Sequence, residues 1–119
     1  MAIGATGEEN TVKQLEFERR QDARGREVVA VRGEIDLATS PALRDQLYEI
    51  IDGGSRQLVV DLTELGFIDS SGLGVLVAAL KHMKEQNGEL VLSGLAQPAL
   101  RVFEITDLTA LFTIEPAAI

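Results

Sequence analysis

Apolar and polar residues along this chain follow two different periods, which together indicate strands alternating with helices. Residues 14–18 are apolar at every second position, at Leu15 and Phe17, as in a half-buried strand. Residues 20–25 form a polar turn, and the valine-rich run at residues 28–31 predicts a second, more deeply buried strand. The two strands are therefore expected to form a hairpin.

Two helices are predicted from apolar residues that recur every three or four positions. The first begins with Ser40 as its N-cap and Pro41 as its first helical residue, and it ends at Gly53-Gly54. Its apolar positions are Leu43, Leu47, Ile50 and Ile51. The second helix ends at Asn87-Gly88. Its apolar positions are Leu73, Leu76, Val77, Leu80 and Met83.

Three further strands are predicted at residues 58–62, 89–92 and 111–114, and residues 98–106 predict a third helix. Gly66 lies in a turn after the first of these strands. The order ββαβαβαβ requires crossover connections, which make the later strands parallel, whereas the hairpin is antiparallel. We therefore expect a single α/β domain with a mixed, mostly parallel sheet of about four to five strands and three or four helices.

Composition limits the domain count and the kinds of partner. A chain of 119 residues accommodates one core, so residues 11–119 are expected to form the domain, and residues 1–10, which lack periodicity, a mobile N-terminal tail. The formal net charge of −8 argues against binding to nucleic acid or to an anionic membrane. The absence of cysteine and of an apolar export or membrane segment favours a cytoplasmic location.

The segment Asp-Ser-Ser-Gly-Leu-Gly at residues 69–74 carries most of the candidate chemistry, because it lies where the second helix is predicted to begin. Unpaired backbone N–H groups and the positive end of the helix dipole favour a phosphate at such a position. Ser70 and Asp69 are equally explained as capping residues, which stabilise a helix start by roughly 1 kcal/mol. On these residues alone, both interpretations stand.

Catalytic and cofactor motifs are absent around this segment. A nucleophile elbow requires glycine two positions before and after the serine, which neither Ser70 nor Ser71 has, and the one histidine, His82, lies far along the same helix. The third glycine of a dinucleotide motif falls on Val77, and no Gly-Lys pair exists for a phosphate-binding P-loop. The chain is therefore not expected to be an enzyme or to hold a cofactor or metal.

Asp36 is the second acidic residue that we single out. It ends the segment Gly33-Glu34-Ile35-Asp36 after the second strand, and Asp69 follows the third. Loops that leave the carboxyl ends of parallel strands lie on one edge of the sheet, so these two acidic loops can be neighbours.

These segments, together with Val-Val-Asp-Leu at residues 59–62, resemble the STAS-domain anti-sigma factor antagonists of bacteria. The resemblance covers residues 12–114 and implies a single STAS-like domain. It further implies that Ser70 is phosphorylated by a partner that is both an anti-sigma factor and a serine kinase. In such a system the unmodified form binds this partner and frees a sigma factor, and a serine phosphatase resets the switch.

By the same resemblance, Asp36 helps the kinase engage, Asp69 flanks the acceptor, and Ser71 and Gly72 shape the helix start. Phosphorylation adds about −1.5 to −2 charge beside Asp69, enough to weaken an interface. The alternative is a STAS-like scaffold that binds a ligand or nucleotide and is not regulated by phosphorylation.

Overall fold

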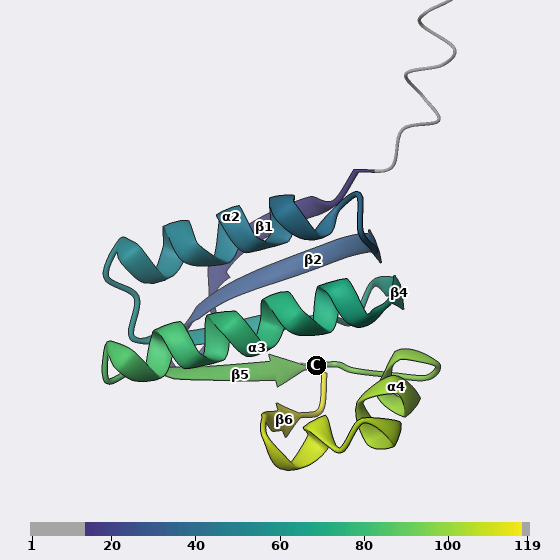
Figure 1. The fold of residues 1–119 in the computed structure, drawn as a ribbon. Helices are drawn as coiled ribbons and strands as arrows, with labels where there is room; N and C mark the ends of the chain where they lie inside the picture. Colours follow the sequence, from purple (N-terminus) through teal and green to yellow (C-terminus); the bar gives the residue numbers. More distant parts are fainter. Residues whose placement is uncertain (1–13, 118–119) are drawn as a thin grey trace, which may run out of the picture.

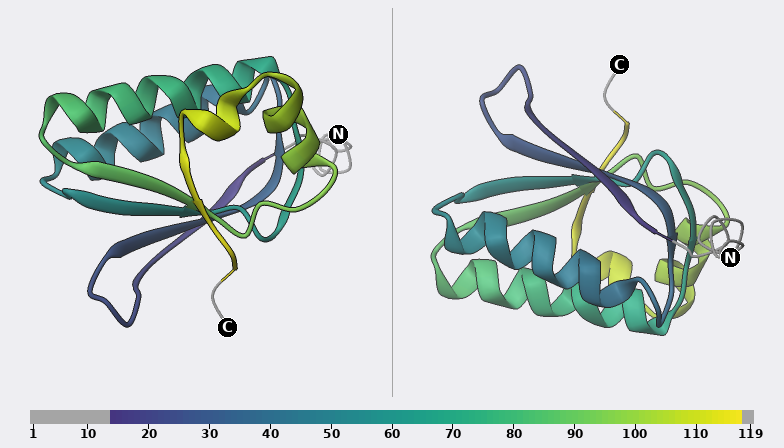
Figure 2. Two further views of the ribbon diagram at one scale, coloured as in Figure 1. Left: turned by 90° about the horizontal axis from the view of Figure 1, so that it is seen from below. Right: turned by 90° about the horizontal axis from the view of Figure 1, so that it is seen from above.

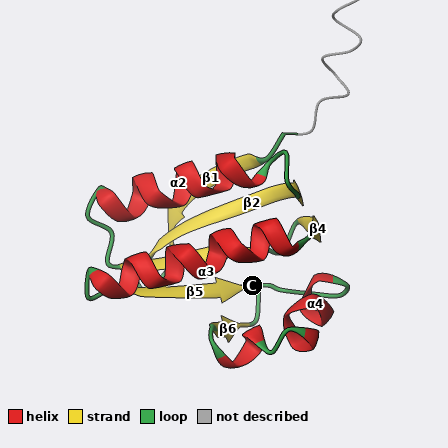
Figure 3. Ribbon diagram, in the orientation of Figure 1, coloured by secondary structure: helices red, strands yellow, loops and turns green. Residues whose placement is uncertain are grey.

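The fold has two layers, a mixed β-sheet and the helices that cover one of its faces (Figures 1 and 2). The computed structural model describes residues 14–117. The predicted tail at residues 1–10 lies outside the described residues. The strands are β1 (Glu16–Gln21), β2 (Glu27–Ile35), β3 (Gln57–Asp61), β4 (Leu65–Ile68), β5 (Glu89–Ser93) and β6 (Thr113–Glu115). The helices are α2 (Ser40–Asp52), α3 (Ser70–Glu85), α4 (Ala99–Ile105) and a short 3₁₀ helix, η1 (Leu108–Ala110) (Figure 3).

The sheet runs in the order β1-β2-β3-β5-β6, and β4 pairs with β2 outside this path. The β1–β2 hairpin is antiparallel, and every other strand pair is parallel, so the mixed, mostly parallel sheet is confirmed. β3 pairs with residues 27–30 of β2, and β4 pairs with residues 33–35 of the same strand. β2 is therefore long enough to hold two successive parallel neighbours.

The sequence prediction differs from the structure in four places. The first strand, predicted at residues 14–18, is β1 at Glu16–Gln21, so it extends into the predicted turn at residues 20–25. β4 was read as a turn around Gly66, which is why the described part of the chain has six strands and not four to five. α2 has Thr39 at its N-cap, one residue before the predicted Ser40. The last strand covers Thr113–Glu115, later than the predicted residues 111–114, because Phe112 precedes the strand and packs its ring against Phe103.

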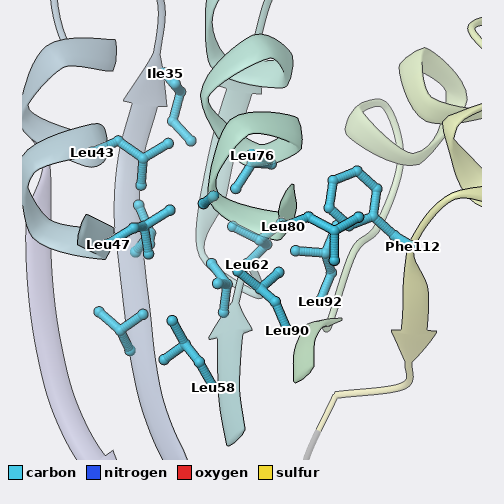
Figure 4. Close-up of a cluster of buried hydrophobic side chains, with 14 of the residues drawn as sticks. Ile35, Leu43, Leu47, Leu58, Leu62, Leu76, Leu80, Leu90, Leu92 and Phe112 are labelled. Atoms are coloured by element: carbon cyan, nitrogen blue, oxygen red, sulfur yellow. The ribbon is translucent and has the colours of Figure 1, made fainter. Parts of the chain in front are cut away.

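The main core lies between the sheet and the helices and is almost entirely aliphatic. Alternate residues of β2, β3 and β5 face the helices, as the two-residue period of a strand requires. The buried side chains drawn in Figure 4 include Leu43 and Leu47 of α2, Leu76 and Leu80 of α3, and Leu58, Leu90 and Leu92 of the sheet.

The opposite face of the sheet carries a smaller cluster, Val28, Val59 and Val91, and charged side chains in place of helices. Arg26 donates two hydrogen bonds of 3.1 Å to the Glu115 carboxylate and one of 2.8 Å to Asp22. The Arg26 side chain is 10% exposed, and it lines a hollow together with Val28 and Val59. These ion pairs connect the β1–β2 hairpin to β6 at the other side of the sheet.

The first turn of α3 packs directly on the ends of β2 and β4. A Cβ added at Gly72 would lie 2.5 Å from Cγ2 of Ile35 and 2.8 Å from Cγ1 of Ile68, so only glycine fits without movement. Gly74, two residues later in the same helix, has nothing within 4 Å of an added Cβ.

Gly72→Ala and Gly74→Ala are therefore expected to change stability in opposite directions. Overpacking against two buried isoleucines destabilises by about 1–3 kcal/mol, of which the better helix propensity of alanine offsets less than about 1 kcal/mol. Gly74→Ala gains that propensity alone, about 0.5–1 kcal/mol. Urea denaturation of both variants measures the difference. If Gly72→Ala were as stable as the parent protein or more stable, the helix start would not be tightly packed.

The ion pairs on the open face predict acid sensitivity. Hydrogen bonding from the Arg26 guanidinium lowers the pKa of the Glu115 carboxyl, so this pair stabilises the fold above the unfolded pKa of about 4.3 and stops doing so as pH falls through the folded value. At pH 7, Glu115→Gln should lower the urea midpoint, and the difference from the parent should shrink towards pH 3.

The matched control is Glu104→Gln, because Glu104 is exposed on α4 and makes no ion pair with another described residue. Its urea midpoint should follow that of the parent at every pH. If the difference in urea midpoint between the parent and Glu115→Gln stayed constant from pH 7 to pH 3, the loss of stability would come from packing and not from charge.

Candidate functional site

The start of α3 is capped by the carboxylate of Asp69. Its backbone is extended, and Oδ1 accepts hydrogen bonds from the N–H of Ser71 at 2.9 Å and of Gly72 at 3.3 Å. The hydroxyl of Ser71 donates to the same oxygen at 2.5 Å. The capping interpretation of Asp69 is thus correct, and the two amide groups that we expected to be open to a phosphate already face its carboxylate.

Ser70 and Ser71 are adjacent but have different surroundings. Ser70 is the first residue of α3, its side chain is exposed, and its hydroxyl makes no hydrogen bond to another described residue. Ser71 is half-buried and its hydroxyl is held by Asp69. Of the two hydroxyls, that of Ser70 is the one that an approaching molecule reaches without breaking a contact.

The turn that contains Asp36 is fixed beside this helix start by strand pairing. Ile35 at the end of β2 is in register with Ile68 at the end of β4, and the next residues in the two chains are Asp36 and Asp69. The N–H of Asp69 donates to the carbonyl of Ile35 at 3.1 Å. Figure 1 shows the ends of β2 and β4 and the starts of α2 and α3 on the same side of the domain. The expectation that the two acidic loops are neighbours is confirmed, with β4 in place of β3 as the preceding strand.

The Asp36 turn is held by its own side chain and by Thr39. Oδ1 of Asp36 accepts from the N–H of Ala38 at 3.0 Å and from the N–H of Thr39 at 3.1 Å. The N–H of Asp36 donates to the hydroxyl oxygen of Thr39 at 2.9 Å. This geometry fixes the position of the Asp36 carboxyl group relative to the start of α3.

Two opposing influences act on Asp69. The hydrogen bond from the Ser71 hydroxyl, with those from the Gly72 and Ser71 amides, lowers the pKa of the Asp69 carboxyl, whereas desolvation and, to a smaller extent, the negative charge of Asp36 raise it. The net pKa shift is downward, so Asp69 is ionised at neutral pH. Ser70 therefore neighbours a negative charge before any modification.

Two exposed apolar side chains, in the segments that lead to Asp69 and follow Asp36, were not identified from the sequence. Leu37, at the tip of the Asp36 turn, is 79% exposed, and Phe67, on β4, is 46% exposed. Phe67 also lines a shallow apolar groove of about 110 Å³ together with Ile68, Pro98, Ala99 and Val102, between β4 and α4. Leu37 directly follows Asp36 in the sequence, but exposure is a property of the folded chain that the sequence pattern does not report.

The described residues 14–117 hold no group of three His, Cys, Asp or Glu side chains placed to bind a metal. Within the same range, no helix has the length and apolar character needed to span a membrane. A hollow of about 700 Å³ lies at the other end of the domain, between the hairpin and the C-terminal end of α2, and none of the candidate site residues lines it.

Comparison with known proteins gives a consistent result. The STAS domain family matches residues 14–118, nearly the whole chain. An anti-sigma-B factor antagonist of Listeria monocytogenes is 42% identical over 89 residues, which cover 73% of this chain and 76% of that protein. An anti-sigma-B factor antagonist of Bacillus subtilis is 37% identical over 86 residues, 72% of this chain and 78% of that protein.

The fold is also similar to that of solved structures. An anti-sigma factor antagonist from Mycobacterium paratuberculosis superimposes with a TM-score of 0.77 at 28% identity, covering 87% of this chain and 86% of the other. The family match and the structural similarity each extend over most of the chain, and the family match at residues 14–118 includes Asp36 and Ser70. The chain belongs to the STAS domain family.

Proposed function

We propose that this protein is an anti-sigma factor antagonist whose binding to its partner is controlled by phosphorylation of Ser70. The unphosphorylated form binds an anti-sigma factor that is also a serine kinase, and a sigma factor is thereby released. Phosphorylation of Ser70 ends the binding, and a serine phosphatase restores it. Relatives at 42% and 37% identity are named anti-sigma-B factor antagonists, which supports this assignment.

The observation that carries the proposal is the state of the Ser70 hydroxyl. It is exposed and unengaged within the described chain, whereas the neighbouring Ser71 hydroxyl and the amides of Ser71 and Gly72 are bonded to the carboxylate of Asp69. A helix cap alone does not require a second serine that is left exposed. A phosphoryl acceptor does require an accessible hydroxyl on a rigid support.

The transfer step needs only ATP from the kinase. Oγ of Ser70 attacks the γ-phosphorus of ATP, the bond from that phosphorus to the bridging oxygen breaks, and ADP leaves with the electron pair of that bond. The serine proton passes to a general base of the kinase. Because Ser70 is the first residue of α3, the kinase can approach it without unfolding the helix.

Electrostatics supports the direction of the switch. A phosphoserine adds about −1.5 to −2 charge next to the ionised Asp69, whose carboxyl already interacts electrostatically with Asp36. Two unit charges about 4 Å apart interact by roughly 4 kcal/mol at an effective dielectric constant near 20. A phosphate at Ser70 that repels an acidic group of the partner, or that removes a basic contact to Asp36, therefore weakens binding. The affinity falls by several factors of ten, since each 1.4 kcal/mol is about tenfold.

The scaffold alternative has a weaker basis. Its best candidate is the hollow near the hairpin, which Arg19, Glu27 and Arg56 line. Arg19 is paired with Glu27, and Arg56 donates to the carbonyls of Ile51 and Ser55. The C-terminal end of α2 borders the hollow with the negative end of its dipole, which disfavours a phosphate. Nothing in this hollow favours a nucleotide over solvent.

The excluded partners and the location that we propose follow from the net charge of the chain and from the kind of protein that it binds. A net charge of −8 disfavours nucleic acid and anionic membranes as direct partners. The protein that it binds, an anti-sigma factor, controls transcription, so we place the protein in the cytoplasm. No cofactor enters the proposed cycle apart from the ATP that the kinase uses.

Labelling with the anti-sigma factor/serine kinase of the same organism and ATP labelled in its γ-phosphate tests the acceptor. We expect one phosphate per chain, lost in Ser70→Ala and retained in Ser71→Ala, because of these two adjacent hydroxyls only that of Ser70 is exposed and unengaged. Peptide mapping by mass spectrometry locates the phosphate. A phosphate on Ser71, or labelling that survives Ser70→Ala, contradicts the assignment.

Binding of the same partner tests the switch. Ser70→Asp should bind at least about tenfold more weakly than Ser70→Asn, because the two side chains have nearly the same shape and differ in charge. Titration calorimetry gives both dissociation constants, and equal thermal melts exclude a folding effect. Equal affinities would mean that charge at this position does not control the interface.

A further inference from the structure

Thr39 is an unusual residue for its position. It is one of three polar side chains buried in the described chain, with 3% of its surface exposed. It occupies the N-cap of α2, where a threonine hydroxyl ordinarily accepts from an amide of the first helical turn, yet its side chain makes no such bond. The hydroxyl is turned away from the helix that it precedes, towards the end of β2.

The hydrogen bonds of this hydroxyl bracket one residue, Ile35, because they reach the peptide units on both sides of it. The hydroxyl oxygen accepts from the N–H of Asp36 at 2.9 Å, and its single proton is donated to the carbonyl of Glu34 at 2.8 Å, the shorter of the available acceptor contacts. Glu34 and Asp36 are the neighbours of Ile35 on either side. The Thr39 side chain therefore fixes the backbone immediately before and after Ile35.

Ile35 is the residue that connects the two loops of the candidate site. Its carbonyl accepts the N–H of Asp69, the capping residue that directly precedes Ser70. A continuous series of hydrogen bonds thus runs from the Thr39 hydroxyl, through the peptide units around Ile35, to the helix start that presents the Ser70 hydroxyl. The same hydroxyl also fixes the turn that carries Asp36 and the exposed Leu37.

We propose that Thr39 is a positioning residue for phosphoryl transfer to Ser70: its buried hydroxyl holds the Asp36 turn and the Ile35 carbonyl in the arrangement that the kinase recognises. This inference rests on the proposed function. Thr39 touches no reacting atom. It acts through Ile35 and Asp69, while Ser70 forms the new bond to phosphorus and ADP departs from the same phosphorus as described above.

Thr39→Val removes the hydroxyl and keeps the shape of the side chain, whereas Thr39→Ser restores the hydroxyl without the methyl group. Thr63→Val is the matched control, because the Thr63 hydroxyl donates to Asp61 in the turn between β3 and β4, away from Ser70. With the kinase and labelled ATP, Thr39→Val should lower the labelling rate, corrected for folded fraction, by roughly tenfold, the size of one lost hydrogen bond. Thr39→Ser and Thr63→Val should stay within about twofold of the parent.

Amide hydrogen exchange by NMR measures the positioning without the kinase. Thr39→Val should accelerate exchange of the Asp69 and Asp36 amides relative to amides of β5, and Thr39→Ser should restore the parent pattern. A residue that only stabilises the fold would accelerate exchange uniformly over the core. Uniform acceleration, or unchanged exchange at Asp69 in Thr39→Val, overturns the inference.

The two proposals fail in different ways. If the parent protein takes up no phosphate, the proposed function is wrong and Thr39 has no transfer reaction to support. If the parent is labelled at Ser70 and Thr39→Val is labelled at the same corrected rate, the function stands and the role of Thr39 is wrong. Slow labelling of Thr39→Val with normal labelling of Thr39→Ser and Thr63→Val is the result that supports both.

Discussion

The parallel pairing between the ends of β2 and β4 is the constraint on which the site depends. Its last register pair joins Ile35 to Ile68, and the hydrogen bond from the Asp69 amide to the Ile35 carbonyl continues the pairing one residue further. Both isoleucines are buried, so a slip of one residue would turn an isoleucine towards solvent and an exposed residue into the core. The penalty for such a slip keeps the Asp36 turn beside Asp69, the residue that precedes Ser70.

The polar groups at this edge divide into those that build the site and the one that remains available. The Asp69 carboxylate and the Ser71 hydroxyl cap α3, and the Thr39 hydroxyl holds the Asp36 turn that follows β2. Gly72 lets the helix start lie directly on Ile35 and Ile68. Because all of these groups serve the local backbone, Ser70 can change its chemical state without removing a contact that the fold needs. This separation of roles suits a switch that acts by binding and not by refolding.

The sequence predicted the elements whose periodicity extends over several turns or strand residues. α3 was clear because Leu73, Leu76 and Leu80 repeat over three turns of one helix face. β4 was missed because its four residues include Gly66 and an exposed Phe67, so neither length nor alternation marks it as a strand. The start of α2 was displaced by one residue because Ser40-Pro41 has the form of a cap, whereas Thr39 occupies that position.

The same distinction applies to the site. Its acidic and hydroxyl residues were identified from Asp-Ser-Ser-Gly-Leu-Gly and from the strand end at Asp36, since their position in the order of elements is visible in the sequence. Thr39, Leu37 and Phe67 were not, because their importance depends on burial, exposure and hydrogen bonds across loops. The sequence pattern reports which residues precede a helix, but not which carbonyl a hydroxyl faces.

The exposed apolar side chains determine how large the proposed switch can be. Between charges in bulk water about 4 Å apart the interaction is only about 1 kcal/mol, which changes affinity less than tenfold. A phosphate at Ser70 has a much greater effect if partner binding removes water from it, because burying an ion without a counter-charge costs several kcal/mol. Leu37, which follows Asp36, and Phe67, two residues before Asp69, are 79% and 46% exposed, and a partner that covers them gains hydrophobic free energy. Under the proposed function, the carboxylates set the sign of the switch, and the apolar residues, by excluding water around Ser70, set its magnitude.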